Sequence, residues 1–480
     1  MSNPALQVYG GDEITAVVID PGSFTTNIGY SGTDCPQAIL PSCYGNYKSV
    51  NQEQDGNSKT KIFEEQSLSF PRPDYEIKPI VENGLIVDWD GAQEQWSWAL
   101  KKLLYLESNQ GIPALLTESI WNTVENKTKS LEVLLEALEF EACYLSSTPT
   151  CVSFATGRPN CLVVDVGHDT SSVSPVVDGM TLSRSTMRNF IAGKYVDVLI
   201  RKYLQPRELI PLFEVAQRRP EFKRKSFDFK VDPSLYQYAN ERGFLQECKE
   251  TLCQVAPTTL EKYIPELEAT AKRSIEAPWA EEIVFDNVSR YGFAEQLFQP
   301  KREDIPEGWS VSQDGIVETW HNDYVPLKRN KPSGKPEKNS NEESPNGEEQ
   351  TSTSETSNEN GKRPMEEPQE NSIAGIADLV SSSITGADVD LRATLAHNIV
   401  LTGGSSSIPG FSDRLMAELT KKLPALKVRV LTTGHLRERQ YQAWLGGSIL
   451  TSLGSFHQLW VGKREYEEVG AERLLNDRFR

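Results

Sequence analysis

Residues 17–32 read VVIDPGSFTTNIGYSG, and this stretch is the strongest indication of the fold. Three β-branched residues lead into Asp20, Pro21 and Gly22 then turn the chain, and an alternating stretch follows. A β-branched run is typical of a buried strand and a Pro–Gly pair of a tight turn, so the pattern predicts a strand, a turn and a returning strand. A carboxylate at the end of a buried strand fits either a capped hairpin or a phosphate and metal site.

A second stretch repeats the pattern. Residues 161–179 read CLVVDVGHDTSSVSPVVDG, in which a hydrophobic strand ends in Asp165, Gly167 follows, and a second strand runs from Val173 to Val177. One Asp-x-Gly motif is a weak signal. Two of them, each at the end of a buried strand, predict two related α/β lobes that face one another.

A third strand-and-turn unit lies late in the chain. Residues 397–419, HNIVLTGGSSSIPGFSDRLMAEL, predict a strand at 399–401, a turn at Gly403 and Gly404, and a helix that opens near Pro409. Paired glycines allow backbone amides to approach a ligand closely. A simple turn between a strand and a helix is the alternative interpretation.

Two stretches between the first two motifs predict amphipathic helices, at 92–106 and 130–140. We interpret their apolar faces as ordinary core packing, formed by Trp96, Leu100, Leu103, Leu104, Leu131, Leu134, Leu135 and Leu138. Residues 44–70 are polar and weakly patterned, which predicts a small flap.

The composition limits the class of protein. At 480 residues, with 38% hydrophobic residues and nine Trp, the chain can form two or more domains with a large core. The net charge of −18 argues against a broad surface for duplex DNA, which requires a basic face. An acidic balance suits solubility or basic partners.

The cysteines and the apolar runs indicate a compartment. The seven Cys form no CxxC pair and the five His form no HExxH motif, so we expect reduced thiols and no zinc site. The chain has no apolar signal region and no run near the ~20 apolar residues that a membrane helix needs. These features predict a soluble, intracellular protein without a membrane partner.

Residues 301–372 break the lobed pattern. From 331 to 372 the only hydrophobic residue is Met365, and from 341 to 372 nine Glu face one Lys and one Arg. Such a segment cannot bury enough apolar surface to offset its ordering entropy, so we predict a largely disordered acidic insertion. It contains a basic stretch, PLKRNKPSGKPEK at 326–338, which fits either a nuclear import signal or a solvated linker.

The order of these motifs resembles the actin family. The segments ENGLIVDWD, PALLTE, ATGR, LFQP, DVDLR, ERQYQAWLGGSIL and REYEEVG are also similar to actin segments, in the same order. Within the family, the chain resembles nuclear actin-related proteins of a budding-yeast type. The features that carry this closer resemblance are the leader VYGGDE, the insertion after LFQP, and the closing RLLNDRFR.

The resemblance implies an α/β fold of two lobes and four subdomains around a nucleotide cleft, as in actin, sugar kinases and heat-shock ATPases. The implied large subdomain of the first lobe comprises 1–41, 79–155 and 442–480, and its small flap subdomain 42–78. The implied large subdomain of the second lobe comprises 156–191 and 287–441, interrupted by the insertion, and its small subdomain 192–286.

The resemblance also implies ATP and Mg²⁺ in the cleft. Asp20 and Asp165 would hold the hydrated Mg²⁺ through waters, since this hard cation usually keeps several of them. The implied cofactor-binding residues are Asp20, Gly22, Ser23, Phe24, Asn27, Asp165, Gly167, His168, Asp169, Thr170, Lys249, Glu250, Gly403, Gly404, Ser407 and Gln440.

Several residues depart from the actin pattern. Asn27 stands where actin has a lysine that reaches the phosphates, and Thr148 and Ser172 replace the glutamine and the histidine that handle the attacking water. Phosphoryl transfer depends on positioning and electrostatics, so we expect very weak hydrolysis or none and assign no catalytic residue. Ser407 and Gln440 also differ from the actin adenine pocket, and we expect His168 to be a hydrogen-bonding side chain and not a base.

The resemblance favours a non-polymerising, ATP-binding nuclear subunit of histone acetyltransferase, histone-variant exchange and nucleosome-remodelling complexes. Such a subunit pairs with actin on a scaffold helix and contributes to histone binding, transcription regulation and DNA repair, and the residues leave direct DNA contact open. The alternatives are a slow ATPase of the actin, chaperone or sugar-kinase fold and a component of a cytoskeletal filament.

Overall fold

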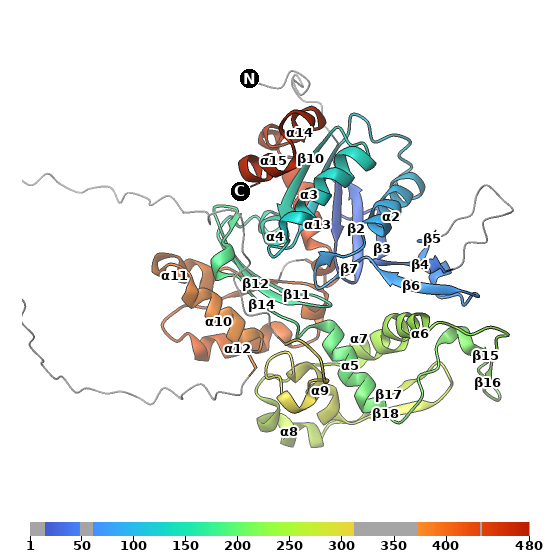
Figure 1. Ribbon diagram of the computed structural model, residues 1–480. Coiled ribbons are helices and arrows are strands. Elements are labelled where there is room, and N and C mark those ends of the chain that lie inside the picture. Colours follow the sequence, from blue (N-terminus) through green and yellow to red (C-terminus); the bar gives the residue numbers. More distant parts are fainter. Residues whose placement is uncertain (1–14, 49–60, 312–372, 433, 480) are drawn as a thin grey trace, which may run out of the picture.

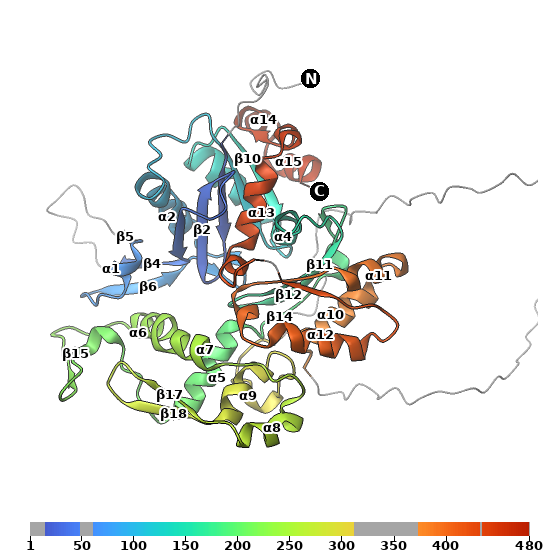
Figure 2. The ribbon, with the colours of Figure 1, turned by 180° about the vertical axis from the view of Figure 1, so that it is seen from behind.

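The protein is an α/β molecule of two lobes, each built on a six-stranded sheet. The structure, a computed structural model, describes residues 15–48, 61–311, 373–432 and 434–479. Figure 1 shows the blue and dark-red first lobe above the green, yellow and orange second lobe, and Figure 2 shows the same division from behind. The predicted fold class is confirmed.

The first sheet contains the first motif at its centre. Strand β1 (Val17–Pro21) pairs antiparallel with β2 (Thr25–Tyr30) and parallel with β9 (Pro113–Glu118). The register places Asp20 opposite Asn27. The outer strands are β3 (Ala38–Pro41), β10 (Ala142–Ser147) and β21 (Val461–Gly462).

The second sheet repeats this arrangement. Strand β11 (Cys161–Val166) pairs antiparallel with β12 (Ser171–Val177) and parallel with β19 (Ile399–Thr402). Its register places Asp165 opposite Ser172, as the first sheet places Asp20 opposite Asn27. The other strands are β13 (Met180–Thr181), β14 (Met187–Asn189) and β20 (Val430–Thr432).

Helices cover both faces of the first sheet. They are α2 (Trp89–Lys102), α3 (Val124–Glu132), the π-helix η2 (Val133–Ala137), α4 (Thr148–Ala155), α13 (Gln442–Thr451), α14 (Lys463–Val469) and α15 (Ala471–Arg478). Of the eight side chains expected in the core, seven are buried, but Leu103 is 36% exposed. This expectation was wrong because α2 ends at Lys102 and the chain turns away at Tyr105, whose φ is 55°.

The second lobe carries a larger set of helices. They are α5 (Gly193–Leu204), α6 (Pro233–Asn240), the π-helix η5 (Glu241–Leu245), α7 (Gln246–Leu252), α8 (Leu260–Glu268), α9 (Asn287–Glu295), α10 (Ile376–Gly386), α11 (Val389–His397) and α12 (Phe411–Lys422). Two hairpins accompany them, β15 (Val215–Gln217) with β16 (Lys223–Arg224) and β17 (Arg273–Glu276) with β18 (Glu282–Phe285).

The two lobes meet again beside α6. On the first lobe, β4 (Cys43–Tyr47) pairs with β5 (Lys61–Ile62) and β6 (Tyr75–Pro79), close to α1 (Glu65–Leu68); a second hairpin joins β7 (Val81–Glu82) to β8 (Leu85–Ile86). The cluster between the lobes consists of Cys43, Leu68 and Tyr75 from the first lobe and Leu235 and Tyr238 from α6. Lys48 adds an ion pair to Asp232, at 2.6 Å between Nζ and Oδ2.

Parts of the sequence-based prediction lie outside the described residues. These are the leader at 8–13, residues 49–60 of the predicted flap, the basic stretch at 326–338, and the insertion from residue 312 onward. Residues 301–311 are described and belong to the folded second lobe, because the Trp309 ring lies 5.7 Å from the ring of Tyr195. Among the described residues, no helix has the length and apolar character needed to cross a membrane.

Candidate functional site

The first loop, residues 22–24, turns the chain between β1 and β2. The Gly22 amide donates to the Thr25 carbonyl at 3.0 Å, and Ser42 Oγ donates to the Gly22 carbonyl at 2.5 Å. A Cβ atom at Gly22 would lie 2.9 Å from the Thr25 carbonyl oxygen, so glycine is required for this tight turn. The loop is therefore a rigid part of the first sheet.

The second loop, residues 167–170, makes the equivalent turn between β11 and β12. The Gly167 amide donates to the Thr170 carbonyl at 3.0 Å. The Gly167 carbonyl accepts from the Gly193 amide at 3.1 Å and from Ser405 Oγ at 2.8 Å. These bonds fix the loop against the N-terminus of α5 and against the turn that follows β19.

Both loops present backbone amides that have no protein partner. Within the described part of the chain, the N–H groups of Ser23, Phe24, His168 and Asp169 make no hydrogen bond. Successive free amides in a turn form a concave site for an anion. The two loops together therefore offer such a site from each lobe.

Two carboxylates lie behind these loops. Asp20 Oδ1 accepts from Thr117 Oγ1 at 2.5 Å and Oδ2 from Asn27 Nδ2 at 3.1 Å, whereas the Asp165 carboxylate has no hydrogen-bond partner among the described residues. Burial and, second, the charge of Asp20 raise the pKa of Asp165 to about 7. A divalent cation between the two groups would relieve this cost, because it favours the ionised form of both.

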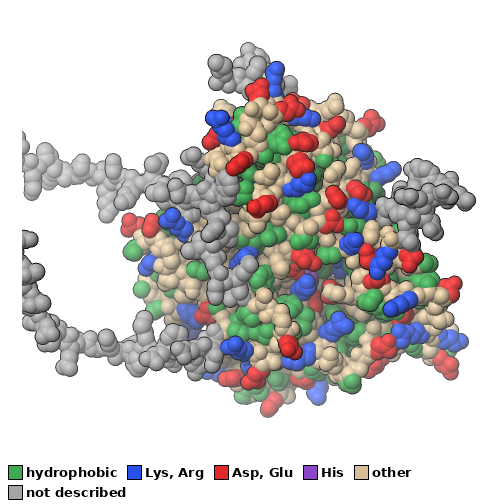
Figure 3. Space-filling view, in the orientation of Figure 1, with side chains coloured by type: hydrophobic (Ala, Val, Ile, Leu, Met, Phe, Trp, Pro, Cys, Tyr) green, Lys and Arg blue, Asp and Glu red, His purple; other side chains and the backbone are tan. Residues whose placement is uncertain are grey.

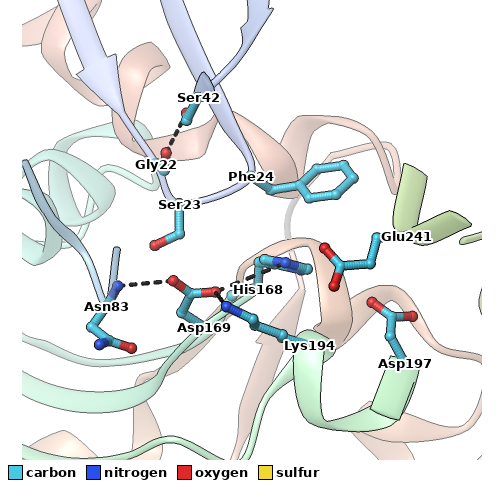
Figure 4. A network of polar contacts seen from close by, with 12 residues as sticks. Gly22, Ser23, Phe24, Ser42, Asn83, His168, Asp169, Lys194, Asp197 and Glu241 are labelled. Carbon is cyan, nitrogen blue, oxygen red and sulfur yellow. Dashed lines mark hydrogen bonds and ion pairs between the residues drawn. The ribbon is translucent and has the colours of Figure 1, made fainter. Parts of the chain in front are cut away.

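Contacts at the loops connect the two lobes directly. The Asn83 amide of the first lobe donates to Asp169 Oδ2 of the second lobe at 2.8 Å (Figure 4), whereas the Gly84 amide donates to Ser23 Oγ at 3.1 Å within the first lobe. The rings of Phe24 and His168 lie 4.8 Å apart. The His168 ring thus packs at a tilt against the opposite loop, and its Nε2 lies 3.8 Å from Asp169 Oδ1. Among the described residues, the expected side-chain hydrogen bond of His168 is not formed.

Three cations surround His168 on the second lobe. Burial, followed by the charges of Lys249, Lys194 and Arg242, lowers the pKa of His168 well below its usual value, so the ring is neutral at neutral pH. Lys194 Nζ lies 3.9 Å from Asp169 Oδ1. Cationic side chains therefore lie close to this loop despite the acidic net charge of the chain.

The glycine pair of the third motif approaches the second loop. Gly403 has φ of +86°, and a Cβ there would overlap the Asp165 carboxylate oxygen and the Val166 carbonyl. A Cβ atom added at Gly404 would lie 3.7 Å from Gln440 Cγ. Ser407 Oγ donates to the Leu436 carbonyl at 3.3 Å. The structure thus brings Gly403 to the carboxylate site, with Gly404, Ser407 and Gln440 on the adjoining turn.

The two residues predicted as a pair, Lys249 and Glu250, lie in different surroundings. Lys249 is buried and its Nζ lies 2.7 Å from Asp197 Oδ2 and 3.5 Å from the Gly193 carbonyl oxygen, close to the second loop. Glu250 is exposed on α7 and accepts from Gln246, and no contact links it to either loop. Successive residues on a helix point about 100° apart, which explains the separation.

A cavity of about 30 Å³ lies behind the first loop, lined by Thr117, Glu118, Asn122 and Thr148, among others. This is enough for one or two waters. Thr148 Oγ1 donates to the Glu118 carbonyl, and the Glu118 carboxylate is held by Lys127 at 2.9 Å and Asn122 at 2.9 Å. The cavity therefore has polar walls, but its one carboxylate is already paired.

Several site residues were missed by sequence reasoning. They are Asn83, Thr117, Lys194, Asp197 and Arg242. Asn83 could have been found from its Asn-Gly pair, which predicts a turn. In the structure, Asn83 has φ of 53° and its amide donates to Asp169. Thr117 lies in the quoted segment PALLTE, but nothing in that segment marked it as a partner of Asp20. Lys194, Asp197 and Arg242 occur in stretches without a motif, and only the fold brings them to the loops.

The loops and carboxylates fit Mg²⁺ with a nucleotide polyphosphate. Free amides and nearby cations suit phosphates, and two carboxylates suit a hydrated hard cation. The described residues contain no group of three or more His, Cys, Asp or Glu that could hold a metal alone. Asp20 and Asp165 would thus share the cation with phosphate and water.

Two facing lobes with paired Asp-x-Gly loops define a class of protein, that of the actin-like fold. The family model described as Actin matches residues 11–479. The chain belongs to the actin family.

Within the family, the chain is similar to proteins named actin-related protein 4. The chain is 67% identical to actin-related protein 4 of Saccharomyces cerevisiae and 62% identical to that of Eremothecium gossypii, in each case over 100% of both chains. It is 32% identical to actin-related protein 4 of Schizosaccharomyces pombe over 97% of both chains. The sequence-based assignment to actin-related proteins is confirmed.

Proposed function

We propose that this actin-related protein binds Mg-ATP between its two loops as a structural ligand and turns it over very slowly or not at all. The single observation that carries the proposal is the pair of amide-presenting loops in front of Asp20 and Asp165, described above. A ligand that binds only the closed fold stabilises it by mass action. The nucleotide would then hold the lobes together.

The weak turnover follows from the cavity behind the first loop. A water there would need a group that orients it or accepts its proton. Thr148 is short and donates to a backbone carbonyl, and the Glu118 carboxylate is engaged by Lys127 and Asn122. In the second lobe, Ser172 lies on strand β12 beyond the loop and is buried.

The nucleotide released from the denatured, freshly purified chain tests this proposal. We expect one ATP per chain, little ADP, and steady-state phosphate release no faster than that of a boiled control. Predominantly ADP, or phosphate release that depends on the intact chain, would contradict it. Thr148→Gln is the informative variant, since a long amide there could orient the cavity water.

We further propose a non-polymerising, nuclear role for the chain as a subunit of histone acetyltransferase, histone-exchange and nucleosome-remodelling complexes. There it would pair with actin on a scaffold helix and contribute to histone binding, transcription regulation and DNA repair. Support comes from three partly exposed apolar side chains near the end of α13, namely Ile449 (38%), Leu453 (40%) and Leu459 (45%). Such side chains suit the apolar face of an amphipathic helix.

Surface charge is compatible with basic partners. On the face shown in Figure 3, Lys and Arg side chains are interspersed with Asp and Glu, which suits histones better than the phosphates of duplex DNA. The net charge of −18 also opposes self-association.

Sedimentation tests this second proposal. The chain alone in Mg-ATP should sediment as a monomer, and a ternary species should form when actin and a scaffold-helix peptide are added. Ile449→Asp should weaken the ternary species, whereas Leu212→Asp, on a 68% exposed residue of the other lobe, should not. Filaments in the first run, or no ternary species in the second, would contradict the proposal.

A further inference from the structure

One cation crosses from the second lobe to the first loop. Arg242 lies on η5 (Glu241–Leu245), the π-helical turn between α6 and α7, beside Gly243, whose φ and ψ are −98° and −106°. Its guanidinium lies 3.9 Å from the centroid of the Phe24 ring and donates to the Phe24 carbonyl. The backbone of Gly243 is non-helical, so the helical run from α6 to α7 is kinked next to Arg242.

Arg242 differs from the two lysines beside it. Lys249 is neutralised by Asp197 at 2.7 Å, and Lys194 lies 3.9 Å from Asp169. Arg242 has no carboxylate partner among the described residues, although its neighbour Glu241 lies near Asp197 (Figure 4). A guanidinium has five N–H donors, so the bond to Phe24 leaves others for an anion.

The first loop lacks a cation of its own. The side-chain amide of Asn27 donates to Asp20. The loop itself contributes the amides of Ser23 and Phe24 and the Ser23 hydroxyl, none of which carries a charge. Three carboxylates, those of Asp20, Asp165 and Asp169, lie around the two loops. A polyphosphate at this place would need a positive charge beyond that of a single divalent cation, and Arg242 is the cation already in contact with the loop.

We propose that Arg242 is a phosphate-binding residue, whose guanidinium joins the amides of Ser23 and Phe24 in holding the phosphates of the nucleotide on the first loop. This inference rests on the proposed nucleotide binding. A planar guanidinium matches phosphate geometry with two parallel hydrogen bonds. Because Arg242 belongs to the second lobe, phosphate bound in this way connects the lobes and favours the closed cleft.

The test compares phosphorylated and unphosphorylated ligands on the full chain. Endogenous nucleotide is removed with EDTA, and dissociation constants for Mg-ATP and adenosine are measured by calorimetry for the native chain, Arg242→Gln, Arg242→Lys and Arg201→Gln. Arg201 is exposed near the C-terminal end of α5, whereas the N-terminal end of this helix contacts the second loop. Its variant therefore makes the same charge change away from the loops.

We expect Arg242→Gln to weaken Mg-ATP about tenfold or more, as for a lost charge-assisted hydrogen bond, and adenosine less than about twofold. Arg242→Lys should recover part of the affinity, since it keeps the charge but not the two-pronged geometry. Arg201→Gln should match the native chain.

Three outcomes would overturn the inference. They are an unchanged Mg-ATP affinity in Arg242→Gln, an equal loss for Mg-ATP and adenosine, and a Mg-ATP loss explained wholly by a lower melting temperature of the nucleotide-free variant. The last two would mean that Arg242 only fastens the lobes through Phe24. If Arg242→Gln does not fold, Arg242→Lys carries the same comparison. A native chain that binds no Mg-ATP would instead defeat the proposed function.

Discussion

The two loops share a backbone design but differ in their surroundings. In the first, the carboxylate of Asp20 is held by Thr117 and Asn27. In the second, the carboxylate of Asp165 has no hydrogen-bond partner among the described residues, and three cations surround His168. The strand–turn–strand unit of the first lobe therefore has its carboxylate fixed by hydrogen bonds, whereas, in the described part of the chain, the unit of the second lobe has an unbonded carboxylate and cationic neighbours.

This difference indicates how a duplicated motif can divide its tasks. Backbone amides depend only on the turn, so both copies keep them. Side-chain charges depend on what packs around the turn: among the described residues, α5 and α7 bring Lys194 and Lys249 to the second loop, whereas the first loop receives a cation only from the other lobe, through Arg242 of η5. The predictions below test whether this division is real.

The largest expected effect concerns Gly403, the glycine of the third motif that packs against the Asp165 carboxylate. Gly403→Ala should lower the free energy of unfolding by about 2–4 kcal/mol, because it adds strain at positive φ to an overlap with Asp165 and Val166. Urea denaturation measures this change.

The control is Gly111→Ala. Gly111 also has positive φ, +78°, but an added Cβ would meet no atom within 4 Å. We expect a cost of about 1 kcal/mol, the strain alone. Equal losses for the two variants would show that the close approach at Gly403 has no energetic role.

The next effect concerns the second loop itself. Gly167→Asp should eliminate nucleotide retention, because a carboxylate beside the free amides repels phosphate and its Cβ lies 3.3 Å from the Thr170 carbonyl oxygen. The chain should lose the ligand's stabilisation, about 2.7 kcal/mol at a hundredfold excess over the dissociation constant.

Nucleotide content and melting temperature in Mg-ATP provide the measurement. Gly454→Asp, at an exposed glycine with open space around it, is the matched control and should keep its nucleotide. If Gly167→Asp retained a full complement of ATP, the second loop would not contact phosphate.

A smaller, pH-dependent effect separates the two carboxylates. The pKa of Asp165 is raised from 3.8 to about 7 in the folded chain, so the folded state binds this proton more tightly than the unfolded state. In nucleotide-free protein, this group therefore makes stability fall as pH rises from about 4 to about 7. Asp165→Asn should melt higher than the native chain at pH 8, with the gap closing towards pH 4.

Adding Mg-ATP should reverse the order at pH 8, because the ionised carboxylate is then needed for the cation. Asp20→Asn should bring no such gain without ligand, since an amide in that place would turn an N–H group toward Thr117 or Asn27. Thermal melts with EDTA and with Mg-ATP make both comparisons. Parallel behaviour of the two variants would contradict the contrast between the loops.

The smallest effect is expected from deleting residues 341–372, which lie outside the described residues. Met365 is their only hydrophobic residue, so they have almost nothing to bury. The melting temperature should change by less than about one degree, and the nucleotide content per chain by less than about one tenth. A large loss would mean that the insertion supports the second lobe.

Much of the candidate site could be predicted from the sequence. Both Asp-x-Gly loops and the Gly403 turn are local patterns, in which strand periodicity and turn residues fix the backbone within a few positions. Leu103 was misplaced because the end of a helix is less well encoded than its apolar face. Glu250 is not brought to the loops, although its neighbour Lys249 lies near them.

The α/β class, the duplicated motif and the membership of the actin family follow from the amino-acid sequence alone, because they depend on local periodicity and on the order of segments. Which charges meet the loops follows from the packing of the lobes. Lys249 is paired with Asp197, the Asn83 amide donates to Asp169, and Arg242 of η5 contacts Phe24. Electrostatic partners are set by distance through space, and residues far apart along the chain acquire that distance only when the lobes pack.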